Sequence, residues 1–212
     1  MRATSRGIPQ NMVQPSEHYA QTPRVSPVSL PNLLTYARIA AVPAVVASFY
    51  IPGDAGRFTA LGIFILAGIT DFLDGYFARA WGQQSALGRM LDPIADKLLV
   101  AAALLVLLAD GTIGGWSLWA ALVILSREIL VSGLRESLAE VRVSVPVSRL
   151  AKWKTAVQMI AIGVLLLGPA GESFFAYTEE LGLTLLWAAA IVTLYTGYDY
   201  FRAGFRHLLG QD

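Results

Sequence analysis

The sequence predicts an all-α, polytopic membrane protein with six transmembrane helices and a polar active site that faces the cytoplasm. Of the 212 residues, 55% are hydrophobic and only 15% are charged, and the mean hydropathy is +0.55. Soluble domains carry about 25% charged residues, so this balance favours a membrane. In addition, six segments reach the roughly 20 mostly apolar residues that a spanning helix needs, and prolines, glycines and charges separate them.

The six helices are expected in order along the chain. Asn32 is a candidate N-cap for the first, and Pro52-Gly53 is its expected stop. Pro93 is compatible with the third if that helix begins only one turn before it, where a missing N–H is harmless. The expected helices cover about 32–52, 57–80, 90–110, 115–138, 150–168 and 178–204.

The chain divides into a polar tail and one membrane domain. Residues 1–28 hold Arg2, Arg6 and Arg24 among polar residues and prolines, without the apolar run of a signal peptide. We interpret them as a mobile tail. An organelle transit peptide is the alternative, but the prolines oppose the amphipathic helix that such peptides form. Residues 29–212 then form a six-helix membrane catalytic domain.

Composition restricts the possible ligands. Cysteine is absent, which excludes disulfides, thiolate metal sites and cysteine nucleophiles. The two histidines, His18 and His207, lie in or near polar ends of the chain, so carboxylates are the credible metal ligands. The net charge is +1 and the pI is about 8.0, so no strong basic field favours nucleic acid, and we predict no nucleic-acid partner.

The distribution of basic residues predicts the orientation, because cytoplasmic flanks of spanning helices are enriched in lysine and arginine. If the N-terminus is cytoplasmic, the inner side and the adjoining helix halves hold 15 of the 16 basic residues, and only Arg57 lies on the other side. The short links on that other side carry acidic residues instead. The N-terminus and the polar site are therefore expected to face the cytoplasm.

Residues 70–97, TDFLDGYFARAWGQQSALGRMLDPIADK, place four aspartates beside the most apolar segments. Each aspartate deep in a bilayer costs about 2.5–3.5 kcal/mol on insertion scales, so a compensating interaction is expected. Asp71 and Asp74 are spaced i, i+3 and share one helical face. Asp92 and Asp96 are spaced i, i+4 on the next helix, and the short link predicts that the two helices pack as antiparallel neighbours with facing stripes.

Small and basic residues accompany the aspartates at helical spacing. Gly75 and Ala78 continue the first stripe, and Gly88 begins the second. The small residues leave room for a flat nucleotide, and Arg79 is suited to a phosphate oxygen. Four carboxylates with open coordination positions suit two divalent cations, Mg²⁺ or Mn²⁺, completed by phosphates of a substrate. The alternative is a set of interfacial charges with glycines that allow helix packing.

This pattern resembles the signature of the CDP-alcohol phosphatidyltransferase family. The pattern D-x2-D-G-x2-A-R-x8-G-x3-D-x3-D matches at every position, and the hydropathy of residues 30–205 agrees with that family's six-helix membrane fold. The resemblance implies that Asp71, Asp74 and Asp92 bind two divalent ions with the diphosphate of a CDP-linked donor. It implies that Asp96 joins them as ligand and general base. The residues that shape the cytidine pocket would be Gly75, Ala78, Arg79 and Gly88.

The acceptor is predicted from basic residues near the cytoplasmic ends of the last three helices. Arg127 lies well within an apolar run, with Glu128 as a possible partner, and an intramembrane arginine usually has a function or a pairing role. A second resemblance, in the pieces A-R-I, R-E-I, G-L-R-E and K-W-K-T, is to the bacterial branch of the family that uses sn-glycerol 3-phosphate. It implies Arg127, Arg135 and Lys154 as ligands of the acceptor phosphate.

Other residues in this region have plainer interpretations. Arg142, Arg149 and Lys152 are equally well explained as positive-inside anchors. Aromatic residues near helix ends more often mark interfacial belts than binding sites; these are Trp81, Trp116, Trp119, Trp153, Trp187, Tyr195, Tyr198 and Tyr200.

Several alternatives share parts of this prediction. Within the family, the acceptor could instead be inositol phosphate, serine or phosphatidylglycerol. A divalent-cation transport protein could use the aspartates as a permeation site, although Arg79 would oppose cation passage. A non-catalytic scaffold is a third alternative. The family resemblance implies a homodimer in the bacterial inner membrane, with CDP-diacylglycerol and glycerol 3-phosphate as substrates and membrane lipid as surroundings.

Overall fold

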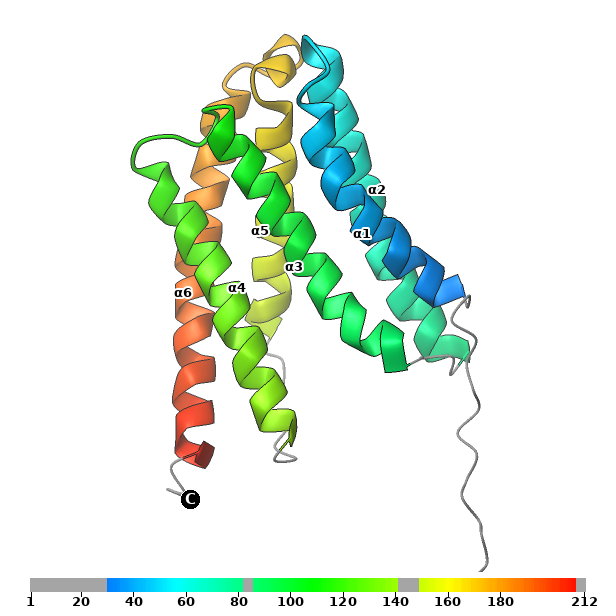
Figure 1. Cartoon of the computed structure of the whole chain (residues 1–212). Coiled ribbons are helices and arrows are strands. Elements are labelled where there is room, and N and C mark those ends of the chain that lie inside the picture. Colours follow the sequence, from blue (N-terminus) through cyan, green and yellow to red (C-terminus); the bar gives the residue numbers. More distant parts are fainter. Residues whose placement is uncertain (1–29, 82–85, 141–148, 209–212) are drawn as a thin grey trace, which may run out of the picture.

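The computed structural model describes residues 30–81, 86–140 and 149–208, and these form six α-helices and one 3₁₀ helix, with no β-strand among them (Figure 1). Within these ranges, the side chains at 31, 74–81, 86–87, 89, 139–140, 149–152, 199 and 202–208 are not described. The elements are α1 (Leu30–Ser48), α2 (Asp54–Trp81), α3 (Ala86–Ala109), α4 (Ser117–Glu140), α5 (Arg149–Leu167), η1 (Gly168–Ser173) and α6 (Thr178–Leu208). The all-α prediction is confirmed for the described residues.

Tight turns join the helices at one end of the molecule. Gly53 precedes α2 with φ +72°, and Gly111 and Gly115 lie between α3 and α4 with φ of +86° and +53°. These left-handed conformations favour glycine because a Cβ would be strained there. Acidic residues in the first turns of α2 and α6 complement the positive ends of the helix dipoles.

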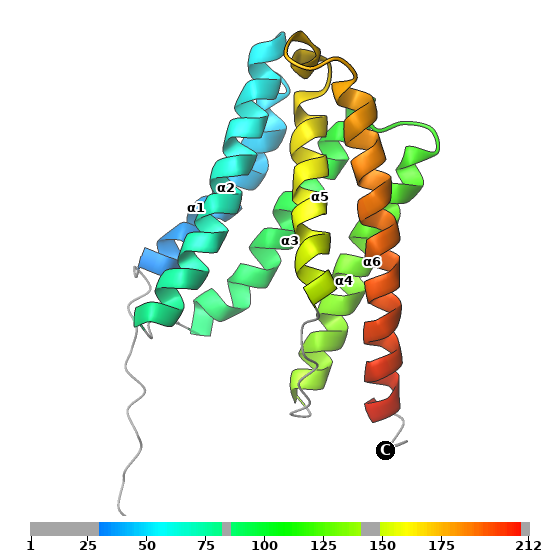
Figure 2. The ribbon, with the colours of Figure 1, turned by 180° about the vertical axis from the view of Figure 1, so that it is seen from behind.

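The helices run alternately up and down the molecule (Figure 1). The helix α1 packs against both α2 and α3, α6 packs against both α4 and α5, and α2 contacts α5. The same arrangement seen from behind places α5 and α6 side by side (Figure 2). The start of α1 and the ends of α2, α4 and α6 therefore lie at one end of the molecule, together with the starts of α3 and α5.

Helix α1 packs against both aspartate-bearing helices. Among the described residues, α2 and α3 contact each other much less than either contacts α1. The facing of the two aspartate stripes stays a prediction, because the side chain of Asp74 is not described. The end of α2 lies close to the start of α3, but the body of α3 tilts away from α2 (Figure 1).

Large hydrophobic side chains lie on the outside of the helices as well as in the core. Leu99, Leu107, Ile162 and Leu165 are fully buried, yet large hydrophobic side chains such as Leu66 (63% exposed) cover the outside. Four helices, α2, α4, α5 and α6, are long and apolar enough to cross a membrane, and α1 contains a shorter apolar segment. These helices are consistent with an integral membrane protein.

Two local expectations in the helices are wrong. Asn32 does not precede α1 as an N-cap, because the helix begins at Leu30 and Asn32 is buried in its first turn. Pro93 lies about two turns inside α3, which begins at Ala86. The backbone there lacks one helical donor, and Lys97 donates a hydrogen bond from Nζ to the carbonyl oxygen of Pro93 at 2.6 Å.

Candidate active site

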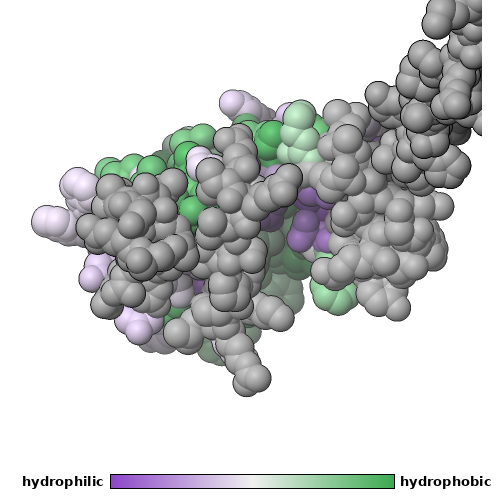
Figure 3. Space-filling model, turned by 90° about the horizontal axis from the view of Figure 1, so that it is seen from below, coloured by the Kyte–Doolittle hydropathy of each residue, from purple (hydrophilic) through white to green (hydrophobic). Residues whose placement is uncertain are grey.

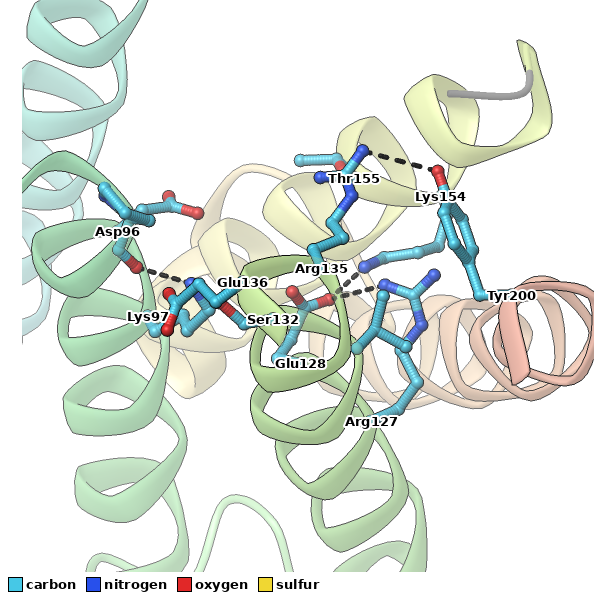
Figure 4. A pocket seen from close by; sticks show the side chains of 12 residues that line it. Asp96, Lys97, Arg127, Glu128, Ser132, Arg135, Glu136, Lys154, Thr155 and Tyr200 are labelled. Carbon is cyan, nitrogen blue, oxygen red and sulfur yellow. Dashed lines mark hydrogen bonds and ion pairs between the residues drawn. The ribbon is translucent and has the colours of Figure 1, made fainter. Parts of the chain in front are cut away.

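A polar cavity of about 410 Å³ opens between α3, α4, α5 and α6 at the end of the molecule where α3 and α5 begin (Figure 4). Seen from this end, the hydrophilic residues lie in a hollow, with hydrophobic residues beside them (Figure 3). Among the side chains that the structure describes, four basic and three acidic ones line the cavity: Lys97, Arg127, Arg135, Lys154, Asp96, Glu128 and Glu136. Their formal sum is positive, so the cavity suits an anionic ligand.

Helix α4 contributes two adjacent stripes to this cavity. Arg127 and Arg135 are spaced i, i+8, and Glu128 and Glu136 have the same spacing one residue later. Residues four or eight apart lie near one face of a helix, so a basic stripe lines the cavity beside an acidic one. This face runs from the middle of α4 towards its end, and charged groups within an apolar helix are costly without partners.

Glu128 forms ion pairs with two basic side chains of the cavity, one on α5 and one on its own helix. Lys154 of α5 is buried and forms an ion pair with Glu128 of α4. Nη1 of Arg127 lies 3.6 Å from the same Oε1 of Glu128. Glu128 therefore holds two of the predicted acceptor ligands together, and the partner role expected for Glu128 agrees with this geometry. A phosphate entering the cavity can share or replace these contacts because it offers further acceptor oxygens.

Two aspartates of the predicted site, Asp71 and Asp92, are held by side chains of α1. Nη1 of Arg38, whose side chain is fully buried, lies 2.7 Å from Oδ1 of Asp71. The hydroxyl of Thr35 donates a hydrogen bond to Oδ1 of Asp92 at 2.5 Å. Thr35 and Arg38 are spaced i, i+3 on α1, so one face of this helix reaches carboxylates on both neighbouring helices. Each contact uses one oxygen of a carboxylate that has two.

Asp96 links the aspartates to the cavity. It lines the cavity from α3, and its carboxylate lies within electrostatic range of Asp71 and Glu128. The structure thus brings Asp96 together with Arg127, Arg135 and Lys154, which the sequence predicted as acceptor ligands.

Part of the predicted donor site lies outside the described side chains. Asp74, Gly75, Ala78 and Arg79 belong to α2, but only their backbone is described. Gly88 is buried in α3. No group of three acidic or histidine side chains that could hold a metal occurs among the described residues. The carboxylate oxygens of Asp71, Asp92 and Asp96 are hard ligands of the kind that Mg²⁺ and Mn²⁺ prefer.

Three residues of this site were not predicted, or were misinterpreted, from the sequence. Thr35 and Arg38 were not predicted, although an arginine within an apolar helix was a usable signal. Tyr200 was assigned to an interfacial belt, but it is only 5% exposed and lines the cavity. That assignment is wrong for Tyr200, whereas Tyr195 and Tyr198 are 60% and 66% exposed.

A sequence model of the CDP-alcohol phosphatidyltransferase family matches residues 28–195, which is most of the chain and includes α1 to α5. The chain belongs to the CDP-alcohol phosphatidyltransferase family. Its CDP-alcohol phosphatidyltransferase signature runs through the end of α2 and the start of α3, where Asp71, Asp92 and Asp96 lie.

Curated relatives in this family share a single name. A protein of Rickettsia bellii is 50% identical over 175 residues, covering 82% of this chain and 94% of the relative. Proteins of Cereibacter sphaeroides and Haemophilus influenzae are each 40% identical and cover 85% of this chain, with 97% and 96% of the relative. All three are named CDP-diacylglycerol–glycerol-3-phosphate 3-phosphatidyltransferase.

Proposed function

We propose that the protein transfers a phosphatidyl group from CDP-diacylglycerol to sn-glycerol 3-phosphate, releasing CMP and forming phosphatidylglycerophosphate. The names of relatives that match nearly their whole length support this choice. The structural observation that carries it is the cavity lined by Asp96, Arg127, Arg135 and Lys154. An acidic group beside three phosphate-binding cations suits an acceptor with a hydroxyl at one end and a phosphate at the other.

The acceptor phosphate is assigned to Arg127, Arg135 and Lys154. Guanidinium groups match phosphate oxygens in bidentate geometry, and the lysine adds a compact charge. Glu128 is close to Arg127 and Lys154 in the free protein, so it pairs with these two cations until the phosphate arrives. Serine has no phosphate for these cations, so this cavity favours a phosphorylated acceptor.

The donor is assigned to the aspartates and the small residues around them. Asp71, Asp74, Asp92 and Asp96 are proposed to hold two divalent cations, Mg²⁺ or Mn²⁺, and the family resemblance assigns the cytidine pocket to Gly75, Ala78, Arg79 and Gly88. When bound, such cations neutralise the diphosphate and lower the pKa of the attacking hydroxyl. Within the protein, Arg38 and Thr35 orient Asp71 and Asp92, as their contacts indicate.

The reaction is a displacement at phosphorus. The acceptor hydroxyl oxygen forms a bond to the phosphatidyl phosphorus, and the bond from that phosphorus to the bridging oxygen of the diphosphate breaks. CMP leaves with the electron pair of the broken bond. The hydroxyl proton passes to a carboxylate oxygen of Asp96, which is the proposed general base.

The proposal also includes the membrane location, the orientation and the oligomeric state of the enzyme. All six helices are proposed to cross a bacterial inner membrane, with the N-terminus and the cavity on the cytoplasmic side, and two copies are proposed to form a homodimer. The concentration of basic residues at the cavity end of the helices supports the orientation. The family resemblance supports the homodimer.

Acceptor-dependent release of CMP tests the proposed function. Purified protein receives CDP-diacylglycerol, Mg²⁺ or Mn²⁺, and either glycerol 3-phosphate, inositol phosphate, serine or phosphatidylglycerol. We expect CMP release only with glycerol 3-phosphate, and loss of release with a chelator. Release that requires serine or inositol phosphate instead contradicts the proposed acceptor. A protein that conducts Mg²⁺ across vesicles without releasing CMP contradicts the whole proposal.

A further inference from the structure

Tyr200 lies at the junction of the two arginines that line the cavity. Its ring centroid is 5.8 Å from Cζ of Arg127 and 5.4 Å from Cζ of Arg135. Nη2 of Arg135 also donates a hydrogen bond to the Tyr200 hydroxyl at 3.4 Å, drawn as a dashed line in Figure 4. The ring face carries the negative part of the aromatic quadrupole, so it attracts both guanidinium groups.

Helix α6 also contacts Arg127 through Thr196, which lies one helical turn before Tyr200. Oγ1 of Thr196 accepts a hydrogen bond from Nη2 of Arg127 at 3.2 Å, while the Thr196 hydroxyl is bonded to the carbonyl oxygen of Val192 at 2.9 Å. At Gly197 an added Cβ would lie 3.1 Å from Cγ of Arg127, so the glycine leaves the space in which this side chain runs. Thr196, Gly197 and Tyr200 are neighbours on one helical surface.

The burial of Tyr200 distinguishes it from the other two tyrosines in this part of α6. Tyr195 and Tyr198 are 60% and 66% exposed, whereas Tyr200 is 5% exposed. The side chain of Arg135 is exposed to solvent. Its contact with the Tyr200 ring therefore restricts a long side chain that would otherwise move freely. Two guanidinium groups repel each other, and an arginine side chain has many rotamers. A ring that contacts both therefore lowers the cost of aligning them for one anion.

We propose that Tyr200 is a positioning residue that sets the affinity of the cavity for the phosphate monoester of the acceptor by holding Arg127 and Arg135 in place. It touches the arginines rather than the reacting atoms. This inference rests on the proposed function for the identity of the acceptor. Two guanidinium groups suit the oxygens of a phosphate monoester dianion.

The test compares three variants in the CMP-release assay. Tyr200→Leu removes the ring and the hydroxyl, and we expect the KM for glycerol 3-phosphate to rise about tenfold, as two weakened cation–π contacts predict. Tyr200→Phe keeps the ring, and we expect its KM to stay within about threefold of the parent. The KM for CDP-diacylglycerol and the kcat should change by less than about twofold.

The chain offers a matched control variant and a second variant that disturbs Arg127. Tyr198→Leu removes an exposed tyrosine from the same helix, and we expect no change in either KM. Thr196→Val removes the hydrogen bond to Arg127, together with the bonds from the same hydroxyl to backbone carbonyl oxygens of α6. It should raise the acceptor KM while leaving Tyr200 in place. Each variant is accepted for kinetics only if its melting temperature and elution volume in detergent match those of the parent. If Tyr200→Leu fails this criterion, Tyr200→Met, which also removes the ring, carries the test.

Specific outcomes overturn the proposal. An unchanged acceptor KM in folded Tyr200→Leu, or equal rises in both KM values, removes the positioning role. A separate measurement keeps the proposed function distinct: the shift in melting temperature caused by inorganic phosphate. If the parent releases no CMP with glycerol 3-phosphate but phosphate stabilises it, and Tyr200→Leu abolishes that shift, the proposed acceptor is wrong and the positioning role stands. If phosphate stabilises parent and variant equally, the positioning role fails.

Discussion

Arg38 is a fully buried arginine on an apolar helix, and its contact with Asp71 joins α1 to the signature segment. A group that holds a metal-binding carboxylate fixes its direction, and removing such a partner typically lowers metal affinity by about ten- to a hundredfold. Asp71 is 48% exposed, so water can solvate its carboxylate when Arg38 is removed. The loss should therefore affect metal binding more than folding.

We predict that Arg38→Met raises the Mn²⁺ concentration for half-maximal CMP release by about tenfold or more. The same variant should need correspondingly more Mn²⁺ to reach its metal-dependent rise in melting temperature, which is a readout independent of turnover. Arg57→Met is the matched control, because Arg57 is an arginine of α2 at the opposite end of the molecule. It should alter stability without altering the Mn²⁺ requirement. An unchanged requirement in folded Arg38→Met contradicts the role given to Arg38.

The sequence predicted those residues of the candidate site whose charge is costly to place in a membrane. Four aspartates beside apolar segments and an arginine within α4 are expensive in a membrane, so their positions alone indicated a site. The contacts of Thr35 with Asp92 were not predictable, because helical spacing identifies a face but not the helix it meets. Tyr200 was misassigned for a related reason. An aromatic residue near a helix end has the same pattern whether it meets lipid or a guanidinium group.

At the scale of elements, the apolar runs predicted each α-helix to within a few residues at most ends. The exceptions have physical causes. The chain leaves α1 at Ser48, although apolar residues continue to Pro52, because a series of turns begins there. The helix α3 starts at Ala86 and tolerates Pro93 in its interior. Helix α1 packs against both α2 and α3, which contact each other much less among the described residues, and the spacing of the link did not predict this.

Arg57 connects elements at the end opposite the cavity. Its guanidinium forms an ion pair with Asp110 and a hydrogen bond to Thr112 at 2.9 Å in the α3–α4 link. Nη1 also donates to the carbonyl oxygen of Leu165 in α5 at 3.4 Å, and Cζ lies 5.4 Å from the centre of the Phe49 ring. One side chain thus ties α2 to the ends of α1, α3 and α5.

Gly168 must remain small for this contact to form. It has φ +47°, and an added Cβ would lie 2.3 Å from Nη1 of Arg57. We predict that Gly168→Ala lowers the melting temperature in detergent more than Gly115→Ala does. Both substitutions place a side chain in the left-handed region at about 1–2 kcal/mol, but the space around Gly115 is open. In an Arg57→Met background this difference should disappear. Equal melting temperatures for the two alanine variants contradict the steric contact.

At the scale of the whole molecule, charge is divided between its two ends. The links between α1 and α2, α3 and α4, and α5 and α6 lie at one end, and the cavity lies at the other (Figure 1). Of the 16 basic residues, Arg57 is the one assigned to the link end, where Asp110 pairs with it. Basic flanks face the cytoplasm in membrane proteins, so the cavity end should be cytoplasmic.

Single cysteines can report this orientation without background, because the chain contains no cysteine. Gly114 is exposed in the α3–α4 link, and a Cβ there meets nothing nearer than 3.6 Å. Ser144 lies in the sequence between α4 and α5, and Ala3 lies in the N-terminal tail. In intact bacterial spheroplasts, a membrane-impermeant maleimide should label Gly114→Cys, whereas Ser144→Cys and Ala3→Cys should react only after lysis. The positive-inside rule requires this pattern because the regions that hold Ser144 and Ala3 carry most loop arginines. The reverse pattern means that the cavity opens to the outside, and labelling of Ser144→Cys and Ala3→Cys on opposite sides means that the number of spans between them is odd.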